Sequence, residues 1–250
     1  MATLTVTTLA ERPELISRIY EVQDTWPQFM GHGVLANALF HRVAADFPQF
    51  CVMATDQDGT PVARGRSVPF RLGGAAYREQ LPDGGWDHVL TWAYDDLYEG
   101  AQTNAASALE IAISPGHRGT GLSYRILAAL REAVVAQGID TLYAPVRPTE
   151  KHLVPRLPMA QYITRTGPED LPVDPWLRVH ARAGAVIEKV APASMVIAGS
   201  LAQWRSWTGL PFDVDGEVIV AGALTPVRCD LAHDYAIYVE PNVWMRHDLS

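Results

Sequence analysis

The chain has 250 residues, of which 48% are hydrophobic and 19% are charged, and this composition excludes a disordered chain. The formal net charge of −8 argues against broad nonspecific binding to nucleic acid or to anionic membranes, because such partners require a basic surface. An anionic ligand must therefore be bound by a local site.

Targeting and cysteine patterns indicate a reduced, cytoplasmic protein. The first residues, MATLTVTTLAERPEL, lack the basic segment and apolar core of a secretory signal. No apolar run approaches the roughly 20 residues that a membrane span needs. The two cysteines, Cys51 and Cys229, have no metal-binding spacing and are expected to be reduced. We therefore expect a cytoplasmic protein without a metal ion.

The first hundred residues are predicted to form a strand, two helices and a hairpin. Apolar periodicity predicts a strand at 3–8, helices at 11–22 and 34–46, and hairpin strands at 51–55 and 62–72. The hairpin turn is centred on Asp58 and Gly59, a pair that favours a tight turn. The segment 73–102 is rich in glycine and acidic residues, and its pattern predicts no particular element.

The order of elements is clearest in the centre of the chain. Strands are predicted at 106–113 and 139–146, on either side of a helix at 119–137. Apolar residues of the helix fall on one stripe, and Gly138 is a suitable cap. The glycine-rich loop before the helix therefore lies at a helix N-terminus, where free N–H groups and the helix dipole favour an anion.

Two common phosphate-binding patterns do not match this loop. A P-loop requires a lysine after its last glycine, but Leu122 follows Gly121. A dinucleotide fingerprint requires a third glycine where this chain has Tyr124. Its ribose-binding acid should also close a strand, whereas Asp140 opens one. A tight turn that needs glycine for a positive φ remains the structural alternative to a phosphate site.

The sequence RGTGLS at 118–123 resembles the Arg/Gln-x-x-Gly-x-Gly/Ala loop of the GNAT acyltransferase superfamily. The resemblance implies that the loop amides bind the pyrophosphate of coenzyme A and that the preceding strand pairs with the pantetheine arm. The cofactor-binding residues that it implies are Ile111, Ile113, Arg118, Gly119, Thr120, Gly121, Leu122 and Ser123.

A histidine replaces the tyrosine that this superfamily often carries four residues before a helix-ending glycine. In the stretch DPWLRVHARAGAVIEKV the helix ends at Gly184, and His180 stands at that position. Tyrosine, with a pKa near 10, donates a proton, whereas histidine, near 6.5, donates or accepts one close to neutrality. As an imidazolium, His180 would hydrogen-bond a thioester oxygen as negative charge develops on it. A cap for local backbone groups is the structural alternative.

Several longer stretches carry a narrower resemblance. VRPTEKHLVPRLPMAQYI, SMVIAGSLAQWRSWTGLPF and YVEPNVWMRHDL, together with Trp26 in DTWPQFMGH, are similar to GNAT-like domains in the loading modules of some polyketide synthases. Such domains bind malonyl-CoA or a related acyl-CoA, decarboxylate it, and have been associated with acyl transfer to an acyl carrier protein. The resemblance covers nearly the full chain.

This narrower resemblance implies a set of site residues. His180 and Thr149 would be catalytic, with Thr120 as the alternative threonine. Trp26 would line the acyl tunnel, and Arg147 or Arg182 would meet a substrate carboxylate. The structural alternatives are an N-cap for Thr149, a core position for Trp26 and a solvated surface for the arginines.

The expected fold is the mixed α/β GNAT fold, a twisted sheet of about seven strands flanked by helices, with a C-terminal extension. We expect one domain over residues 1–250, with a coenzyme A-binding core at about 105–190 and the extension at about 191–250. The first functional hypothesis is decarboxylation of malonyl-CoA, transfer of the acyl group to a carrier-protein thiol, or both. Acetylation of an amine, with His180 as general base, and coenzyme A binding without catalysis are the alternatives.

Overall fold

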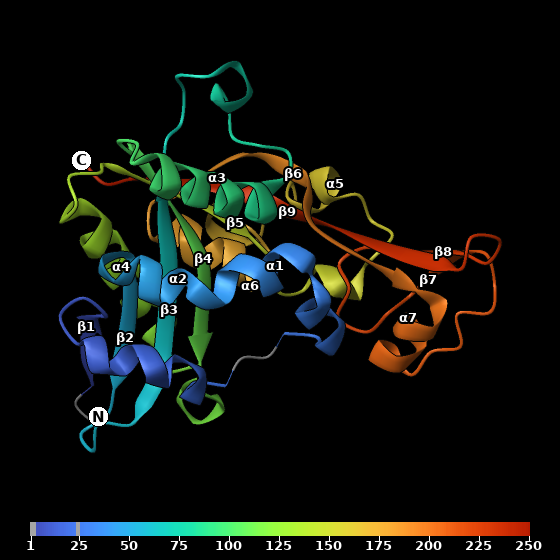
Figure 1. Ribbon diagram of the computed structural model, residues 1–250, viewed down its shortest axis with the longest axis horizontal. Coiled ribbons are helices and arrows are strands. Elements are labelled where there is room, and N and C mark those ends of the chain that lie inside the picture. The colour runs from blue at the N-terminus through green and yellow to red at the C-terminus, as the bar shows by residue number, and fades with distance from the viewer. Residues whose placement is uncertain (1–3, 24–25) are drawn as a thin grey trace.

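The computed structural model describes residues 4–23 and 26–250 (Figure 1). Its strands are β1 (Thr5–Thr8), β2 (Cys51–Thr55), β3 (Pro61–Phe70), β4 (Ala105–Ile113), β5 (Thr141–Val146), β6 (Val186–Ser200), β7 (Gly216–Val218), β8 (Val227–Asp230) and β9 (Tyr235–Asp248). Its α-helices are α1 (Val34–Leu39), α2 (Val43–Asp46), α3 (Gly85–Glu99), α4 (Leu122–Val135), α5 (Met159–Tyr162), α6 (Pro175–Arg182) and α7 (Leu201–Thr208). Residues Pro13–Glu21 form a 3-10 helix.

The strands form a mixed sheet in the order β1-β2-β3-β4-β5-β9-β8-β7, and β6 also pairs with β9. Each pair among β1, β2, β3 and β4 is antiparallel, whereas β4 and β5 are parallel. Strand β9 is antiparallel to β5, β6 and β8. Because β9 pairs with β5 at one end and with β8 at the other, the C-terminal strands continue the same sheet.

Helices cover both faces of the sheet. Adjacent residues of a strand face opposite sides, and β3 shows what lies on each. On one side a Cβ atom at Gly65 would lie 2.8 Å from Ile126 of α4. On the other side the guanidinium of Arg66 lies 3.5 Å from the ring centroid of Phe40. Phe40 also contacts Trp86 of α3, so α3 lies opposite α4 across the sheet.

Strands β4 and β5 pair only at their beginnings and then separate. Two residue pairs join them, Ala106 with Leu142 and Ser107 with Tyr143. Just beyond this point β4 carries a bulge, because consecutive residues of β3 pair with Ala108 and Glu110 and leave Leu109 unpaired. The carbonyl of Leu109 accepts a hydrogen bond from Trp86 Nε1 at 3.0 Å. The bulge bends β4 where the strands separate.

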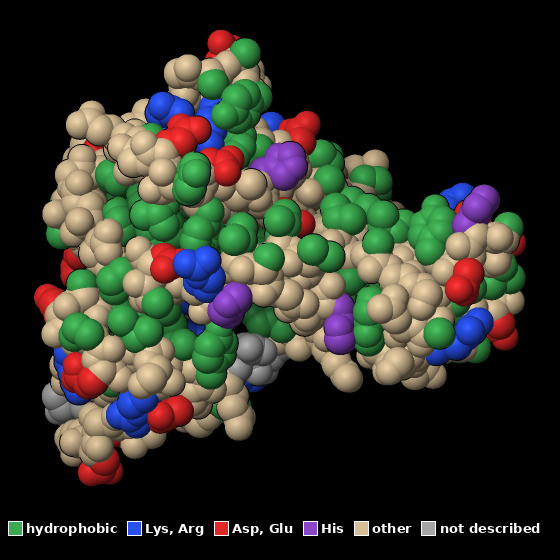
Figure 2. Space-filling view, viewed as in Figure 1, with side chains coloured by type: hydrophobic (Ala, Val, Ile, Leu, Met, Phe, Trp, Pro, Cys, Tyr) green, Lys and Arg blue, Asp and Glu red, His purple; other side chains and the backbone are tan. Residues whose placement is uncertain are grey.

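The end of the chain extends from the body as an arm. It contains α7, β7, β8 and the first half of β9, at the right of Figure 1. Figure 2 shows that the arm is narrower than the body. Within the arm, buried Trp204 joins α7 to β9 through a 2.7 Å hydrogen bond from its Nε1 to the Ala236 carbonyl. No helix in residues 4–23 and 26–250 is long and apolar enough to cross a membrane.

The fold confirms the expected class and refines its details. The hairpin, the central strand-loop-helix-strand unit and the helix before Gly184 lie where they were predicted. The sheet of the described residues has nine strands rather than about seven, because β7 and β8 are added in the arm. The predicted helix 34–46 is divided into α1, a 3-10 turn and α2, and the segment 73–102 contains α3. Cys51 and Cys229 are buried and unpaired.

The close approach of α4 to β3 predicts a cost for any side chain at Gly65. In Gly65→Ala the new methyl group would lie 2.8 Å from Ile126 and 3.0 Å from Leu130, so the free energy of unfolding should fall by about 1–3 kcal/mol. Urea unfolding measures this difference. Gly31→Ala is the matched control, since no atom lies within 4 Å of its Cβ position, and it should leave stability nearly unchanged. Equal stabilities for the two variants would contradict the proposed packing.

Candidate active site

A row of backbone N–H groups is unpaired at the start of α4. No N–H group of residues 119–123 donates to another group of the described chain. Gly119 and Gly121 have φ values of +73° and +80°, which a residue with a side chain rarely adopts. The loop is exposed, and it joins the N-terminus of a 14-residue helix. These N–H groups can therefore bind an anionic group such as a phosphate.

A cavity of about 590 Å³ leads from this loop into the gap between β4 and β5. Its lining is mainly apolar. The lining includes residues of β4 from Ala108 to Ile113, residues of β5 from Ala144 to Val146, Trp26, Trp86, Arg118, Gly119, Ser123, Arg147, Thr149, Trp176, His180 and Asn242. Past Ser107 no residue of β4 pairs with β5, so the β4 backbone edge faces this gap. An extended ligand can add to that edge as a strand does.

Glu110 lies in the cavity wall and is held as a carboxylate by two arginines of β3. Arg64 donates to it through Nε at 2.8 Å and Nη2 at 2.9 Å, and Arg66 donates through Nε at 2.9 Å. Burial acts to raise the pKa of Glu110, but the charges and hydrogen bonds of the two arginines outweigh it and hold the pKa below its ordinary value. The ionic cluster joins β3 to β4 beside the bulge.

His180 projects from α6 into this cavity. The helix begins at Asp174, whose carboxylate accepts hydrogen bonds from the N–H groups of Trp176 and Leu177. It ends before Gly184, which has a φ of +86°. Burial lowers the pKa of His180 to about 3, and the neighbouring His247 adds to this effect. This lowered pKa favours a neutral imidazole near pH 7 over the imidazolium that the sequence suggested.

A second histidine lies against the first. His180 Nδ1 and His247 Nε2 are 2.9 Å apart, so one ring donates a hydrogen bond to the other. His247 is on β9, opposite Leu142 of β5, and is buried. Burial lowers its pKa to about 4, with a further contribution from the charge of Arg131. The site thus contains two neutral imidazoles in direct contact.

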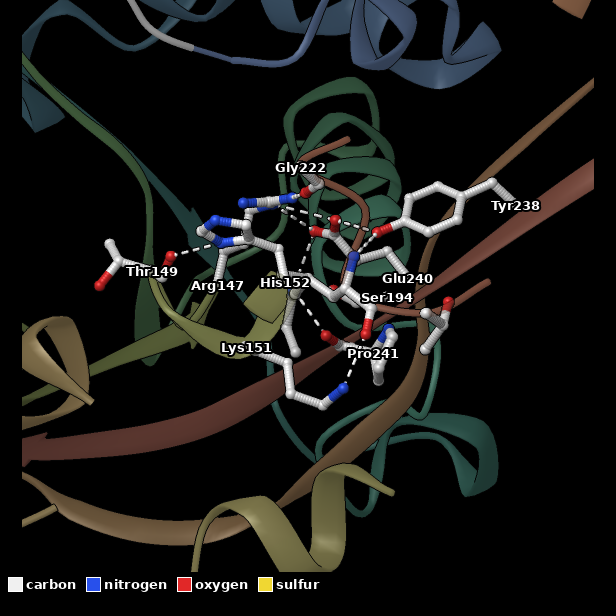
Figure 3. Close-up of polar contacts among 12 residues, drawn as sticks. Arg147, Thr149, Lys151, His152, Ser194, Gly222, Tyr238, Glu240 and Pro241 are labelled. Atoms are coloured by element: carbon white, nitrogen blue, oxygen red, sulfur yellow. Dashed lines mark hydrogen bonds and ion pairs between the residues drawn. The ribbon is translucent and has the colours of Figure 1, made fainter. Parts of the chain in front are cut away.

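Arg147 reaches the cavity from the end of β5 and is held in place by the arm. Its Nε lies 2.9 and 3.1 Å from the two carboxylate oxygens of Glu240, and its Nη2 donates to the Gly222 carbonyl at 2.6 Å (Figure 3). Glu240 is fully buried and also accepts from Tyr238 and Asn242. Arg147 Nη1 makes no hydrogen bond within residues 4–23 and 26–250, so this nitrogen can bind a ligand.

Of the other predicted catalytic and substrate residues, some line the cavity and some lie outside it. Thr149 is exposed and lines the cavity, and Trp26 lines it with its ring centroid 5.7 Å from the Arg147 guanidinium. Thr120 does not line it, and its hydroxyl donates to the His117 carbonyl at 2.7 Å. Arg182 is also outside the cavity, half-exposed and 3.7 Å from Glu169. The structure thus brings together Thr149, Trp26 and Arg147 but not Arg182.

Of the predicted cofactor-binding residues, those that line the cavity are Ile111, Ile113, Arg118, Gly119 and Ser123. Thr120, Gly121 and Leu122 lie in the adjoining loop and helix start, where their N–H groups are unpaired.

Residues that the sequence did not single out also reach the cavity, and they include Glu110, Trp86, Trp176 and Asn242. Trp176 lies one helical turn before His180, a spacing that was readable in the sequence. His247 gave no such signal, because it is 67 residues away.

The comparisons with known proteins agree on one superfamily. The chain is 30% identical, over 97% of its length and 93% of the relative, to the arginine N-acetyltransferase avaD of Aspergillus versicolor. It resembles the loading GNAT-like domain of CurA from Lyngbya majuscula, with a TM-score of 0.61, 18% identity and coverage of 100% and 98% of the two chains. It also resembles the GphF GNAT-like decarboxylase in complex with isobutyryl-CoA, with a TM-score of 0.55, 15% identity and coverage of 99% and 100%. No protein-family model matches the sequence.

The fold and the site define a GNAT-type acyltransferase, with a glycine loop at a helix N-terminus beside two separating strands. The chain belongs to the GNAT acyltransferase superfamily. Proteins of this superfamily use acyl-CoA, and the proteins named above comprise an N-acetyltransferase with similar sequence and two GNAT-like domains with similar folds. Among the described residues, no group of three or more His, Cys, Asp or Glu side chains is arranged to hold a metal ion.

The lowered pKa of His180 predicts a loss of stability in mild acid. Below about pH 6.5 the unfolded chain protonates this histidine, whereas the folded chain does not until about pH 3. The contribution of His180 to the free energy of unfolding is therefore greatest above pH 6.5 and falls toward pH 3, by about 2 kcal/mol at pH 5. In His180→Gln, urea unfolding should show a smaller loss between pH 7 and pH 5. The exposed His233→Gln is the control and should keep the original slope.

Proposed function

We propose that the protein transfers an acyl group from coenzyme A to the amine of a small substrate that also carries a carboxylate. One observation carries this proposal: a single cavity connects the unpaired N–H groups of the loop with His180 and Arg147. It is supported by the 30% identity with an arginine N-acetyltransferase over nearly the whole of both chains.

Coenzyme A would occupy the loop and the gap between the strands. The N–H groups of residues 119–123 and the side chain of Arg118 would bind its pyrophosphate. Its pantetheine arm would add to the free edge of β4 at Ile111 and Ile113. This placement directs the thioester along β4 toward His180, which lines the same cavity.

The acceptor would enter from the side of Trp26 and the arm. Arg147 would bind its carboxylate through Nη1, since Nε and Nη2 are held by Glu240 and Gly222. The amine would attack the thioester carbon beside His180. An amine becomes more acidic once it has bonded to that carbon, so a weakly basic imidazole can accept its proton at this stage. Thr149 would hydrogen-bond the thioester oxygen as it gains negative charge.

Decarboxylation of malonyl-CoA, with acyl transfer to an acyl carrier protein, is the second candidate. The observation that favours it is a neutral His180 in a mainly apolar cavity. A neutral N–H would stabilise the enolate that forms when carbon dioxide leaves, and the apolar wall would keep water from it. In this reaction Arg147 would bind the malonyl carboxylate before it is lost.

One set of incubations distinguishes the two candidates. The protein is given acetyl-CoA with a panel of amines that includes arginine, and separately malonyl-CoA with and without an acyl carrier protein. Mass spectrometry follows every acyl species. An acetylated amine formed from acetyl-CoA supports the proposal, whereas acetyl-CoA formed from malonyl-CoA without amine acylation overturns it. Gly121→Val is the control, because a β-branched residue is strained at a φ of +80°, and it should abolish either reaction by weakening coenzyme A binding.

The two predicted arginines should respond differently to the same substitution. Arg147→Lys keeps a positive charge beside Glu240 but loses the guanidinium edge, so the KM for arginine should rise about 10-fold. Agmatine, which lacks the carboxylate, should show an unchanged KM. Arg182→Lys is the matched control and should alter neither value, because Arg182 lies outside the cavity. Equal effects of Arg147→Lys on both amines would contradict a carboxylate contact.

A further inference from the structure

The contact between His180 and His247 leaves one nitrogen of each ring without a hydrogen bond. His180 Nε2 has no hydrogen-bond partner in the described chain, yet it is not among the fully buried nitrogens that lack one. Because His180 lines the cavity, this nitrogen has access to it. His247 Nδ1 is fully buried and has no partner within hydrogen-bonding distance.

The direction of the hydrogen bond between the rings decides what His180 offers to a ligand. If His247 Nε2 donates, His180 keeps its own proton on Nε2 and presents a donor to the cavity. If His180 Nδ1 donates, its Nε2 is bare and presents an acceptor. A neutral imidazole carries a single ring proton, so the two arrangements exclude each other. The position of the ring proton on His247 therefore determines whether His180 Nε2 is a donor or an acceptor.

The proposed amine acylation requires the second arrangement, because only a bare Nε2 of His180 can accept a proton from the attacking amine. In that arrangement His180 Nδ1 donates to His247 Nε2, and the ring proton of His247 lies on Nδ1. The carbonyl of Ala183, the C-cap residue of α6, accepts from Arg131 Nη1 at 3.1 Å, which holds the end of this helix in place.

We propose that His247 is a positioning residue that keeps His180 in the tautomer with a proton on Nδ1 and a bare Nε2 facing the cavity. This inference rests on the proposed amine acylation, in which Nε2 takes the proton from the attacking nitrogen. The amine nitrogen bonds to the thioester carbon, its N–H bond breaks, a new N–H bond forms at Nε2, and the electron pair stays on the amide nitrogen. The C–S bond then breaks, and coenzyme A leaves as a thiolate that takes up a proton. The positive charge on His180 is then stabilised by its Nδ1–H bond to His247.

This tautomer also favours one candidate reaction over the other. A bare Nε2 accepts a proton from an amine, but it has no hydrogen to donate to the enolate oxygen of a decarboxylated thioester. His247 would thus direct the site toward acyl transfer to nitrogen. Thr149, which also lines the cavity, is left as the donor to the thioester oxygen.

The first test reads the tautomer directly. Nitrogen-15 NMR of the full chain, labelled at histidine, distinguishes protonated from bare ring nitrogens at pH 7. His180→Gln and His247→Gln assign the signals. We expect His180 to be protonated at Nδ1 and bare at Nε2, with His247 protonated at Nδ1. A protonated Nε2 on His180 overturns the proposal whatever reaction the protein catalyses.

The second test separates positioning from simple packing. His247→Phe keeps a buried ring but removes the acceptor, and should lower kcat for amine acetylation by about 100-fold while both KM values stay within about 3-fold. His247→Gln restores an acceptor and should recover at least about a tenth of the original kcat. Unchanged kcat in His247→Phe overturns the proposal. If the original protein acylates no amine, the proposed function fails, and the NMR experiment still decides the tautomer.

Discussion

The separation of β4 from β5 is the constraint on which the rest of the site depends. The two parallel strands share two residue pairs, and β5 then pairs along its other edge with six residues of β9. The free edge of β4 exposes backbone groups in a mainly apolar cavity, where unpaired N–H and C=O groups are costly. A ligand that adds to this edge satisfies them. His180 of α6 lines the same cavity.

Buried polar groups maintain this opening. The bulge at Leu109 bends β4 away, and its unpaired carbonyl is satisfied by Trp86 of α3. Glu110, next along the strand, is joined to β3 by two arginines. On the other side, the carboxylate of Asp174 caps α6 and accepts a hydrogen bond from the N–H of Glu150. Polar contacts with α3 and β3 thus fix β4 on one side of the gap, and the hydrogen bond between Glu150 and Asp174 fixes the start of α6 on the other.

The arm and the cavity are connected through one network. Glu240 is fully buried in β9 and holds Arg147, while Asn242 lines the cavity and accepts from the Ser194 hydroxyl. Ser194 in turn accepts from the N–H of Trp86 at the start of α3. One end of the cavity therefore has an arginine held by a carboxylate, and the other end has a pair of imidazoles. In the proposed reaction these two ends would hold the carboxylate-bearing amine and the thioester.

The sequence by itself determined the central unit, because local patterns specify it. Apolar periodicity placed α4 between β4 and β5, and the glycines of RGTGLS indicated the loop and its superfamily. The position of His180 followed from its spacing to Gly184. Only the tertiary structure decided the neutral state of His180, its contact with His247, the pairing of Arg147 with Glu240 and the exclusion of Arg182. Burial and contacts between distant segments determine these properties, and neither is encoded in the spacing of neighbouring residues.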